Sequence, residues 1–254
     1  MSSKNELFLL EEIAKRNFEA RYKDSVLGIL WSILKPLLIM ILLTIIFSTL
    51  FANRIENYPV YLLAGKCIYD FFASSTNLSA TAIKYNSNII KNTSSKKYTF
   101  VVGGIISEFL NFLITLMILI AVMIFTHAEF HFLTIPLSII PIISLIMMLI
   151  GIGLTLSILC MYYADIQHLW SVIAMIGMYA SAIFYPMDII PEPYHQYLVL
   201  NPIFWIIDQF RSLAVYGTIP NITYILNSLL LSAIILVFGI IIFKKFEKQI
   251  TLKY

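Results

Sequence analysis

Residues 16–51 read RNFEARYKDSVLGILWSILKPLLIMILLTIIFSTLF, a stretch in which a charged segment runs directly into an apolar one. The charged part is too polar for hydrocarbon, whereas the part from Pro36 onward has no charged side chain. We therefore expect the junction between the two parts to lie at a membrane surface. Trp31 and Lys35 lie in this junction and are residue types that anchor helices at such an interface. Pro36 suits the first turn of a new helix, where its missing N–H group costs little.

The composition of the whole chain agrees with a membrane environment. Of its 254 residues 60% are hydrophobic and only 12% are charged, whereas a soluble domain has about 25% charged residues. The two cysteines, Cys67 and Cys160, are too few for a disulfide scaffold. The first apolar run follows a charged head, so we expect no cleavable signal peptide. These features predict an integral membrane protein.

Apolar segments long enough to cross a membrane recur along the chain. A transmembrane helix needs about 20 mostly apolar residues, a length that the first segment reaches only if it begins near Trp31. The sequence predicts an all-α fold with six transmembrane helices, of which the fifth is the shortest. The six segments are residues 36–51, 59–80, 101–126, 135–162, 169–185 and 222–243.

Lysine and arginine residues are distributed unevenly around these segments. Fourteen of the 17 lie in the N-terminal head, in the connection between the second and third segments, or in the C-terminal tail. The other connections hold only Arg54 and Arg211. Because cytoplasmic loops carry an excess of lysine and arginine, both termini are predicted to be cytoplasmic.

The N-terminal residues 3–24 are predicted to form an amphipathic helix. One apolar stripe consists of Leu7, Leu10, Ala14, Phe18 and Tyr22. Such a helix either packs on a soluble partner or lies in the membrane interface. We favour the interface because the helix leads directly into a membrane span.

Two connections are unusual in composition. Residues 83–98 are polar and basic, and they form either a solvated loop or a short helix that buries isoleucines. Residues 186–221 are too polar to span and too apolar for an ordinary loop, and their prolines predict two short helices near 192–199 and 203–215. We expect this pair to re-enter the outer leaflet, either as a membrane-surface cap or as a gate.

Charged side chains inside the predicted spans are costly and usually have a role. Lys66 and Asp70 are four residues apart and share one face of the second span. Glu108 and Asn111 lie one turn apart in the third span. These four side chains either hold helices together or reach the interface, or they line a translocation path.

Other chemistry has little support in the sequence. No GxxxxGK[ST] phosphate-binding motif occurs, so the chain is not expected to hydrolyse ATP itself. His127, Glu129 and His131 have a spacing that can bind zinc, but three such residues on a short loop are weak evidence, and we expect no metal. No catalytic group is discernible, and no nucleic-acid partner is expected at a net charge of +3.

Several motifs resemble one family. Arg21-Tyr22, Ser25, Leu27-Gly28, Trp31 and Pro36 resemble the RYxxSxLGxxWxxxxP pattern of bacterial transport permeases, the membrane subunits of ABC exporters for O-antigen, capsule and teichoic acid. The resemblance extends to Ser107-Glu108 with Asn111, and to Asn201-Pro202 followed by Arg211, Gly217 and Pro220. One departure is Tyr163-Ala164-Asp165-Ile166, where the family usually has an arginine in place of Ala164.

The resemblance implies a single permease domain over residues 1–254 that works as a homodimer in the bacterial cytoplasmic membrane. It implies a separate ATPase subunit that binds ATP and Mg, and a cargo of glycan on an undecaprenyl diphosphate carrier among the membrane lipids. A path along Lys66, Asp70, Glu108 and Asn111 would carry the cargo. The expected ATPase-coupling residues are Ile83, Tyr85, Ile89, Ile90 and Lys91. The expected outer-gate residues are Asp188, Glu192, Tyr194, His195, Asn201, Pro202 and Arg211.

Two other functions fit the same composition. The architecture also serves ABC exporters of drugs or small lipids, and a neighbouring resistance gene would favour that function over glycan export. A membrane enzyme or scaffold would need no ATPase, and co-purification of an ATPase would exclude it.

Overall fold

The computed structural model describes residues 3–23, 25–51, 54–92 and 96–253, and this part of the chain is helical without strands. The predicted all-α class is therefore confirmed. The α-helices are α1 Ser3–Tyr22, α2 Leu30–Phe51, α3 Tyr58–Tyr85, α4 Ser87–Asn92, α5 Tyr98–Phe125, α6 Ile139–Tyr162, α7 Asp165–Tyr179, α8 Glu192–Val199, α9 Pro202–Ala214 and α10 Ile222–Lys253. Two short 3₁₀ helices, η1 Ile135–Ser138 and η2 Met187–Ile189, precede α6 and α8.

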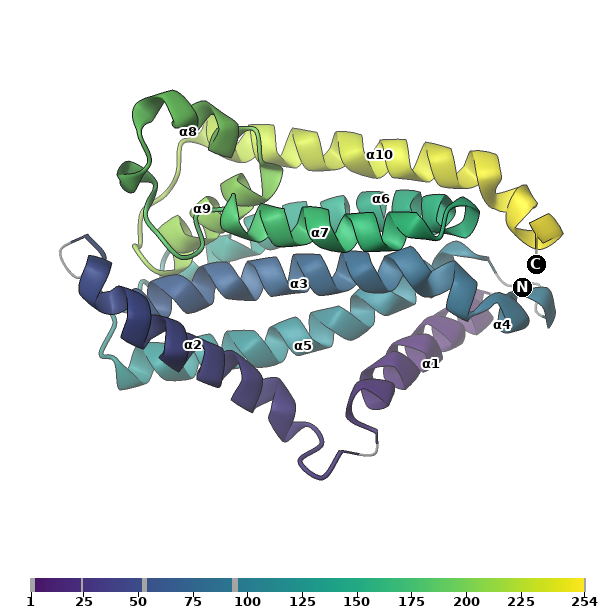
Figure 1. Cartoon of the computed structure of the whole chain (residues 1–254), viewed down its shortest axis with the longest axis horizontal. Coiled ribbons are helices and arrows are strands. Elements are labelled where there is room, and N and C mark those ends of the chain that lie inside the picture. The colour runs from purple at the N-terminus through teal and green to yellow at the C-terminus, as the bar shows by residue number, and fades with distance from the viewer. Residues whose placement is uncertain (1–2, 24, 52–53, 93–95, 254) are drawn as a thin grey trace.

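The long helices α3, α5, α6 and α10 form a bundle along the longest axis of the molecule, and α3 lies at its centre (Figure 1). α3 packs against α5 and α6, and most of its side chains are buried. α6 and α10 approach so closely at Gly151 and Gly239 that a Cβ atom on either glycine would overlap backbone atoms of the other helix. Small residues at such a crossing allow membrane helices to pack backbone to backbone.

Four helices in the described residues are long and apolar enough to cross a membrane. They are α2, α5, the stretch Ile135–Tyr162 and Ile222–Ile250 of α10. The predicted spans 59–80 and 169–185 fall on α3 and α7. α3 has polar side chains along its length, some of which are buried, and α7 has only 15 residues and ends at Tyr179. The chain is thus a multi-pass membrane protein with at least these four apolar helices.

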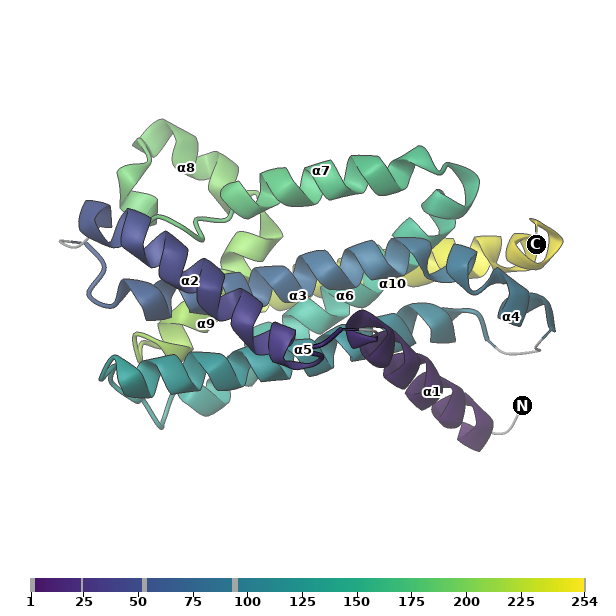
Figure 2. The same ribbon diagram turned by 60° about the horizontal axis from the view of Figure 1, so that its bottom comes forward.

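The N-terminal helix α1 packs against the beginning of α5 (Figure 2). Ile13 and Ala14 are buried there, and Ile13 lies against Gly103, where a Cβ atom would come within 2.8 Å of its side chain. The predicted stripe holds in part: Ala14 is buried and Leu10 and Phe18 are half-buried, but Leu7 is 64% exposed and the stripe omitted Ile13. The close approach that Gly103 allows selects the buried face, and this selection depends on a helix distant in sequence.

The turn between α1 and α2 is set by Gly28, whose φ of +50° favours glycine. α2 begins at Leu30, so the expectation that Pro36 lies in a first turn was wrong. The turn at Gly28 lets the helix begin at Leu30, and Pro36 therefore lies inside the helix. Proline is tolerated within membrane helices when neighbouring groups satisfy the freed carbonyl.

Candidate functional site

A groove of about 510 Å³ lies between the end of α1 and the helices α2, α3 and α5. It brings together the four polar residues predicted within spans and three positions of the family pattern. These seven residues are Arg21, Trp31, Pro36, Lys66, Asp70, Glu108 and Asn111. The sequence identified both sets, but not that they line the same groove.

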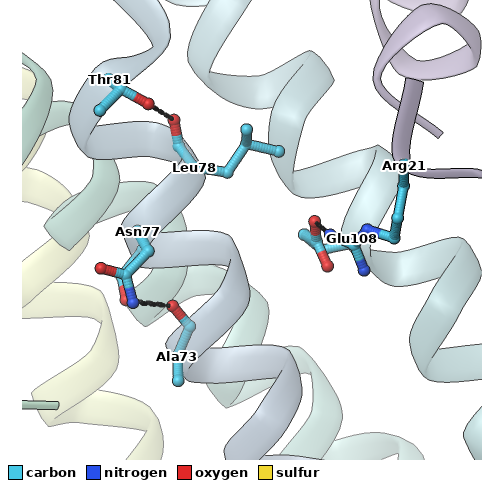
Figure 3. Close-up of polar contacts among 7 residues, drawn as sticks. Arg21, Ala73, Asn77, Leu78, Thr81 and Glu108 are labelled. Carbon is cyan, nitrogen blue, oxygen red and sulfur yellow. Dashed lines mark hydrogen bonds and ion pairs between the residues drawn. The ribbon is translucent and has the colours of Figure 1, made fainter. Parts of the chain in front are cut away.

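The centre of the groove is an ion pair between Arg21, in the last turn of α1, and Glu108 on α5 (Figure 3). The side chain of Glu108 is only 2% exposed, whereas that of Arg21 is 39% exposed. A buried carboxylate is tolerated only when it is paired and hydrogen-bonded. Arg21 therefore holds the interface helix to a buried charge within the bundle.

A second ion pair joins Lys66 and Asp70, one turn apart on α3. The Asp70 side chain is 46% exposed and that of Lys66 is 16% exposed. Lys35 enters the groove from α2 and makes no ion pair with any residue that the structure describes. The groove is therefore lined by three cations and two carboxylates.

Apolar side chains also line the groove. Phe71 on α3 and Phe112 on α5 stack with ring centroids 4.9 Å apart, and Ile39 on α2 lies beside them. None of the described side chains of α2 is fully buried, although Leu37, Met40 and Phe47 pack against the core, so this helix lies at the edge of the bundle. A groove lined by both charged and apolar side chains suits a ligand that has both polar and apolar parts.

The remaining residues of the family pattern shape the turn into α2. The Gly28 N–H group donates to the Ser25 hydroxyl at 3.3 Å, which stabilises this turn. The Ser32 hydroxyl donates to the Ile29 carbonyl at 2.6 Å. The side chain of Tyr22 lies outside the described residues. Two pattern positions, Ser25 and Gly28, thus form part of the turn that lies between Arg21 and Trp31.

Several polar side chains of α3 bond to their own helix and do not enter the groove. Asn77 donates to the Ala73 carbonyl at 2.8 Å, and the Thr81 hydroxyl donates to the Leu78 carbonyl at 3.2 Å (Figure 3). The polar residues of α3 are thus of two kinds: Lys66, Asp70 and Ser74 line the groove, whereas Asn77 and Thr81 do not.

The predicted coupling segment contains a short helix, α4, and two of its three isoleucines are buried within the chain. Ile83 and Ile90 are 0% and 4% exposed within the chain's own core, and Ile89 packs against that core. Within the described residues Ile83 and Ile90 are thus covered by the chain itself, and the contact of this segment with an ATPase stays a prediction. Tyr85 and Lys91 remain exposed.

Polar contacts tie this segment to α1. Arg16 donates to the Asn86 side chain at 2.6 Å, between α3 and α4. Lys96 pairs with Glu6 at 3.0 Å, and this hydrogen-bonded pair raises the pKa of Lys96. Sequence reasoning missed both contacts, because nothing local links residues that lie so far apart in the chain. One helix therefore touches both the coupling segment and the groove.

The connection 186–221 contains the two predicted helices, α8 and α9, but its arginine, Arg211, is buried. Arg211 is 4% exposed and donates to the carbonyls of Tyr61, Ala182 and Ile183 at 3.1, 2.9 and 2.9 Å. Its guanidinium also lies 3.5 Å from the centre of the Tyr61 ring. Arg211 thus clamps non-helical backbone in which Ala182 has a φ of 48°.

The other predicted gate residues divide between structural and exposed positions. Asn201 caps α9 by accepting from Ile203 N–H at 3.1 Å, and Pro202 begins that helix. Asp188 is exposed and pairs with Arg54 at 2.8 Å. Exposed side chains also include Glu192 and Tyr194, whereas His195 is partly buried and contacts the Ile190 carbonyl at 2.7 Å.

An all-helical membrane protein with a charged groove between its helices has the features of a transport subunit. The family model described as "ABC-2 type transporter" matches residues 9–215, and the chain therefore belongs to this family. It is accordingly a transport subunit and not an enzyme, with ATP hydrolysis on a separate partner. The family resemblance read from the sequence is confirmed.

Relatives in three organisms extend this finding. The chain is 31% identical over 241 residues to the O-antigen export system permease protein RfbA of Klebsiella pneumoniae, covering 94% of this chain and 92% of the relative. It is 23% identical to the RfbA protein of Myxococcus xanthus over 217 residues, 84% of this chain and 82% of that one. It is 25% identical to the polysialic acid transport protein KpsM of Escherichia coli over 215 residues, 84% and 83% of the two chains.

Proposed function

We propose that this chain is the membrane-spanning subunit of an ATP-driven exporter that moves a polysaccharide across the bacterial cytoplasmic membrane. The observation that carries the proposal is the groove, where the family pattern and the charged residues of the spans meet. The relatives named for O-antigen and polysialic acid transport support a glycan cargo. We extend this to a glycan on a lipid carrier of the undecaprenyl diphosphate type.

The arrangement of the helices supports a topology with six spans. α3 and α7 join α2, α5, α6 and α10, and α8 and α9 form the re-entrant pair. Both termini and α4 lie at one end of the bundle, and α8 lies at the other (Figure 1). Because lysine and arginine are concentrated at the end that holds the termini and α4, we propose that this end is cytoplasmic.

Coupling to the ATPase follows from the same orientation. The ATPase subunit, which carries ATP and Mg, docks at the cytoplasmic end through the exposed side chains of Tyr85 and Lys91. The contacts from α1 to Asn86 and Glu108 provide a physical connection from that end to the groove. Two copies of the chain form the complete pore, with residues 186–221 at its outer mouth.

Deletion of the gene for this chain tests the proposed cargo. We expect the surface polysaccharide to disappear and its lipid-linked form to accumulate inside the cell, with both effects reversed by the wild-type gene. Restoration by a Lys244→Gln variant, altered far from the groove, serves as the matched control. Unchanged surface glycan together with new sensitivity to drugs would contradict glycan export and favour a drug exporter.

A further inference from the structure

We infer that the last part of α10 binds an anionic phospholipid of the membrane, whose headgroup lies on Lys244, Lys245 and Lys248. These three lysines are exposed and follow the apolar part of the helix. α10 runs to the end of the bundle that holds both termini (Figure 1). The inference concerns the lipid that surrounds the chain, and it does not depend on which cargo the chain exports.

Exposed apolar side chains lead along one face of α10 directly to the lysines. This α10 stripe consists of Leu230, Ile234, Val237 and Ile241, each more than half exposed. The four residues follow one another at spacings of four, three and four, and such spacings keep side chains on one face of a helix. Lys244 and Lys248 continue the same spacing beyond Ile241. The lysines are therefore in line with the α10 stripe.

The opposite face of this part of α10 is held by the chain itself. Phe243 and Ile250 are 2% and 0% exposed, and Phe246 packs against the core. Lys97 donates to the carbonyl of Glu247 at 2.9 Å. Because these contacts fix the rotation of the helix about its axis, the lysines point away from the bundle and toward the surrounding lipid.

The length of the α10 stripe matches the depth of one membrane leaflet. From Leu230 to Ile241 the helix rises by about 16 Å, and half of a hydrocarbon core of about 30 Å is about 15 Å. Lys244 follows one turn later, at the depth where headgroups begin. Lysine keeps its methylene stem on apolar surface while its charge extends toward the headgroups. A lipid with its chains along the stripe thus places its phosphate at the lysines.

The charge of the lysines favours an anionic lipid over other neighbours. None of the three forms an ion pair with any residue that the structure describes, Glu247 included. The ammonium group of Lys245 lies 5.7 Å from the centre of the Phe246 ring, a contact that leaves its charge in place. A second copy of this face would bring lysine against lysine. An anionic headgroup supplies the opposite charge, and each lysine strengthens its binding by about fivefold.

Quenching of tryptophan emission by brominated lipids tests this site directly. Ile241→Trp introduces an indole at the end of the α10 stripe of the full-length purified chain, which is reconstituted in vesicles of phosphatidylglycerol and phosphatidylcholine. The emission of the unsubstituted chain is subtracted. We expect brominated phosphatidylglycerol to bind beside position 241 about fivefold or more tightly than brominated phosphatidylcholine. Equal quenching by the two lipids would overturn the inference.

Leu226→Trp is the matched control, because Leu226 is exposed and lies four residues before Leu230, at the end of α10 that has no lysine. The two lipids should quench equally there, and the same preference at both positions would contradict the site.

Replacement of the lysines tests whether they hold the headgroup. Combining Lys244→Gln, Lys245→Gln and Lys248→Gln should lower the preference at position 241 to that at position 226. Lys244→Gln alone should lower it only in part, and three arginine substitutions should keep it. A preference that survives the triple glutamine variant would show that the lysines do not contact the headgroup and would overturn the inference.

Two additions distinguish a lipid from other partners of the lysines. Glycerol 3-phosphate in solution should leave the quenching unchanged, because it has no chain to lie along the α10 stripe; displacement of the lipid would show a site for phosphate alone and contradict the inference. The ATPase subunit should also leave the quenching unchanged, and it should co-purify with the triple glutamine variant. Displacement of the lipid by the ATPase, with loss of co-purification in that variant, would assign the lysines to the ATPase instead.

Discussion

The ion pair between Arg21 and Glu108 predicts a pronounced asymmetry between two substitutions. Arg21→Met leaves the Glu108 carboxylate, 2% exposed, without its cation. Removal of one partner from a buried pair costs about 3–5 kcal/mol. We expect the lower value, about 3 kcal/mol, because Arg21 is 39% exposed and water reaches the pair from one side.

The reverse substitution should cost much less. Glu108→Gln removes the buried charge and leaves Arg21, whose exposed guanidinium can bind water, so we expect a loss of about 1 kcal/mol. The double variant should be more stable than Arg21→Met alone. Unfolding of the purified chain in mixed micelles, followed by circular dichroism as the fraction of denaturing detergent rises, measures all three. If Arg21→Met costs no more than Glu108→Gln, Glu108 is not a desolvated carboxylate and the reasoning is wrong.

Three further predictions concern other parts of the chain. Arg211→Met should destabilise the chain by about 3 kcal/mol in the same unfolding assay, because three carbonyls lose a charged, buried donor and only that of Ala182 keeps a further side-chain donor, the Tyr61 hydroxyl; a loss below 1 kcal/mol, on the order of an exposed pair, would contradict the clamp. Gly239→Ala should cost about 1–3 kcal/mol by forcing α6 and α10 apart, whereas Leu226→Ala on the exposed face of α10 should cost far less; equal costs would refute the close crossing. Tyr85→Ala with Lys91→Glu should abolish co-purification of the ATPase subunit without loss of stability, whereas Ile90→Asp should unfold the segment; retained ATPase binding in the first variant would place the contact elsewhere.

The elements that depend on local sequence could be predicted. Hydropathy indicated the membrane helices, and prolines located α8 and α9 to within a residue or so. Charged residues within spans were identified from their cost in hydrocarbon. These signals come from neighbours along the chain and from the environment of each segment.

The features that depend on distant contacts could not be predicted. Arg21 and Glu108 are 87 residues apart, and no periodicity connects them. Ile90 belongs to the chain's own core because α4 folds back on it, which its amphipathic pattern alone does not show. Arg211 lies in an outer connection, where an exposed arginine is the ordinary expectation, but the carbonyls of a bent segment surround it. The polar groove thus emerged only when four helices were placed together.

Cross-linking from within the groove tests most directly whether the exported glycan passes through it. A photoreactive amino acid at Thr115, which lines the groove, is compared with one at Leu226 on the exposed face of α10 in cells that contain the complete exporter. We predict that irradiation attaches glycan to the chain only from Thr115, and only while the ATPase subunit is active. Absence of glycan at Thr115 during active export, or equal labelling from Leu226, would contradict the groove as the route of the polysaccharide.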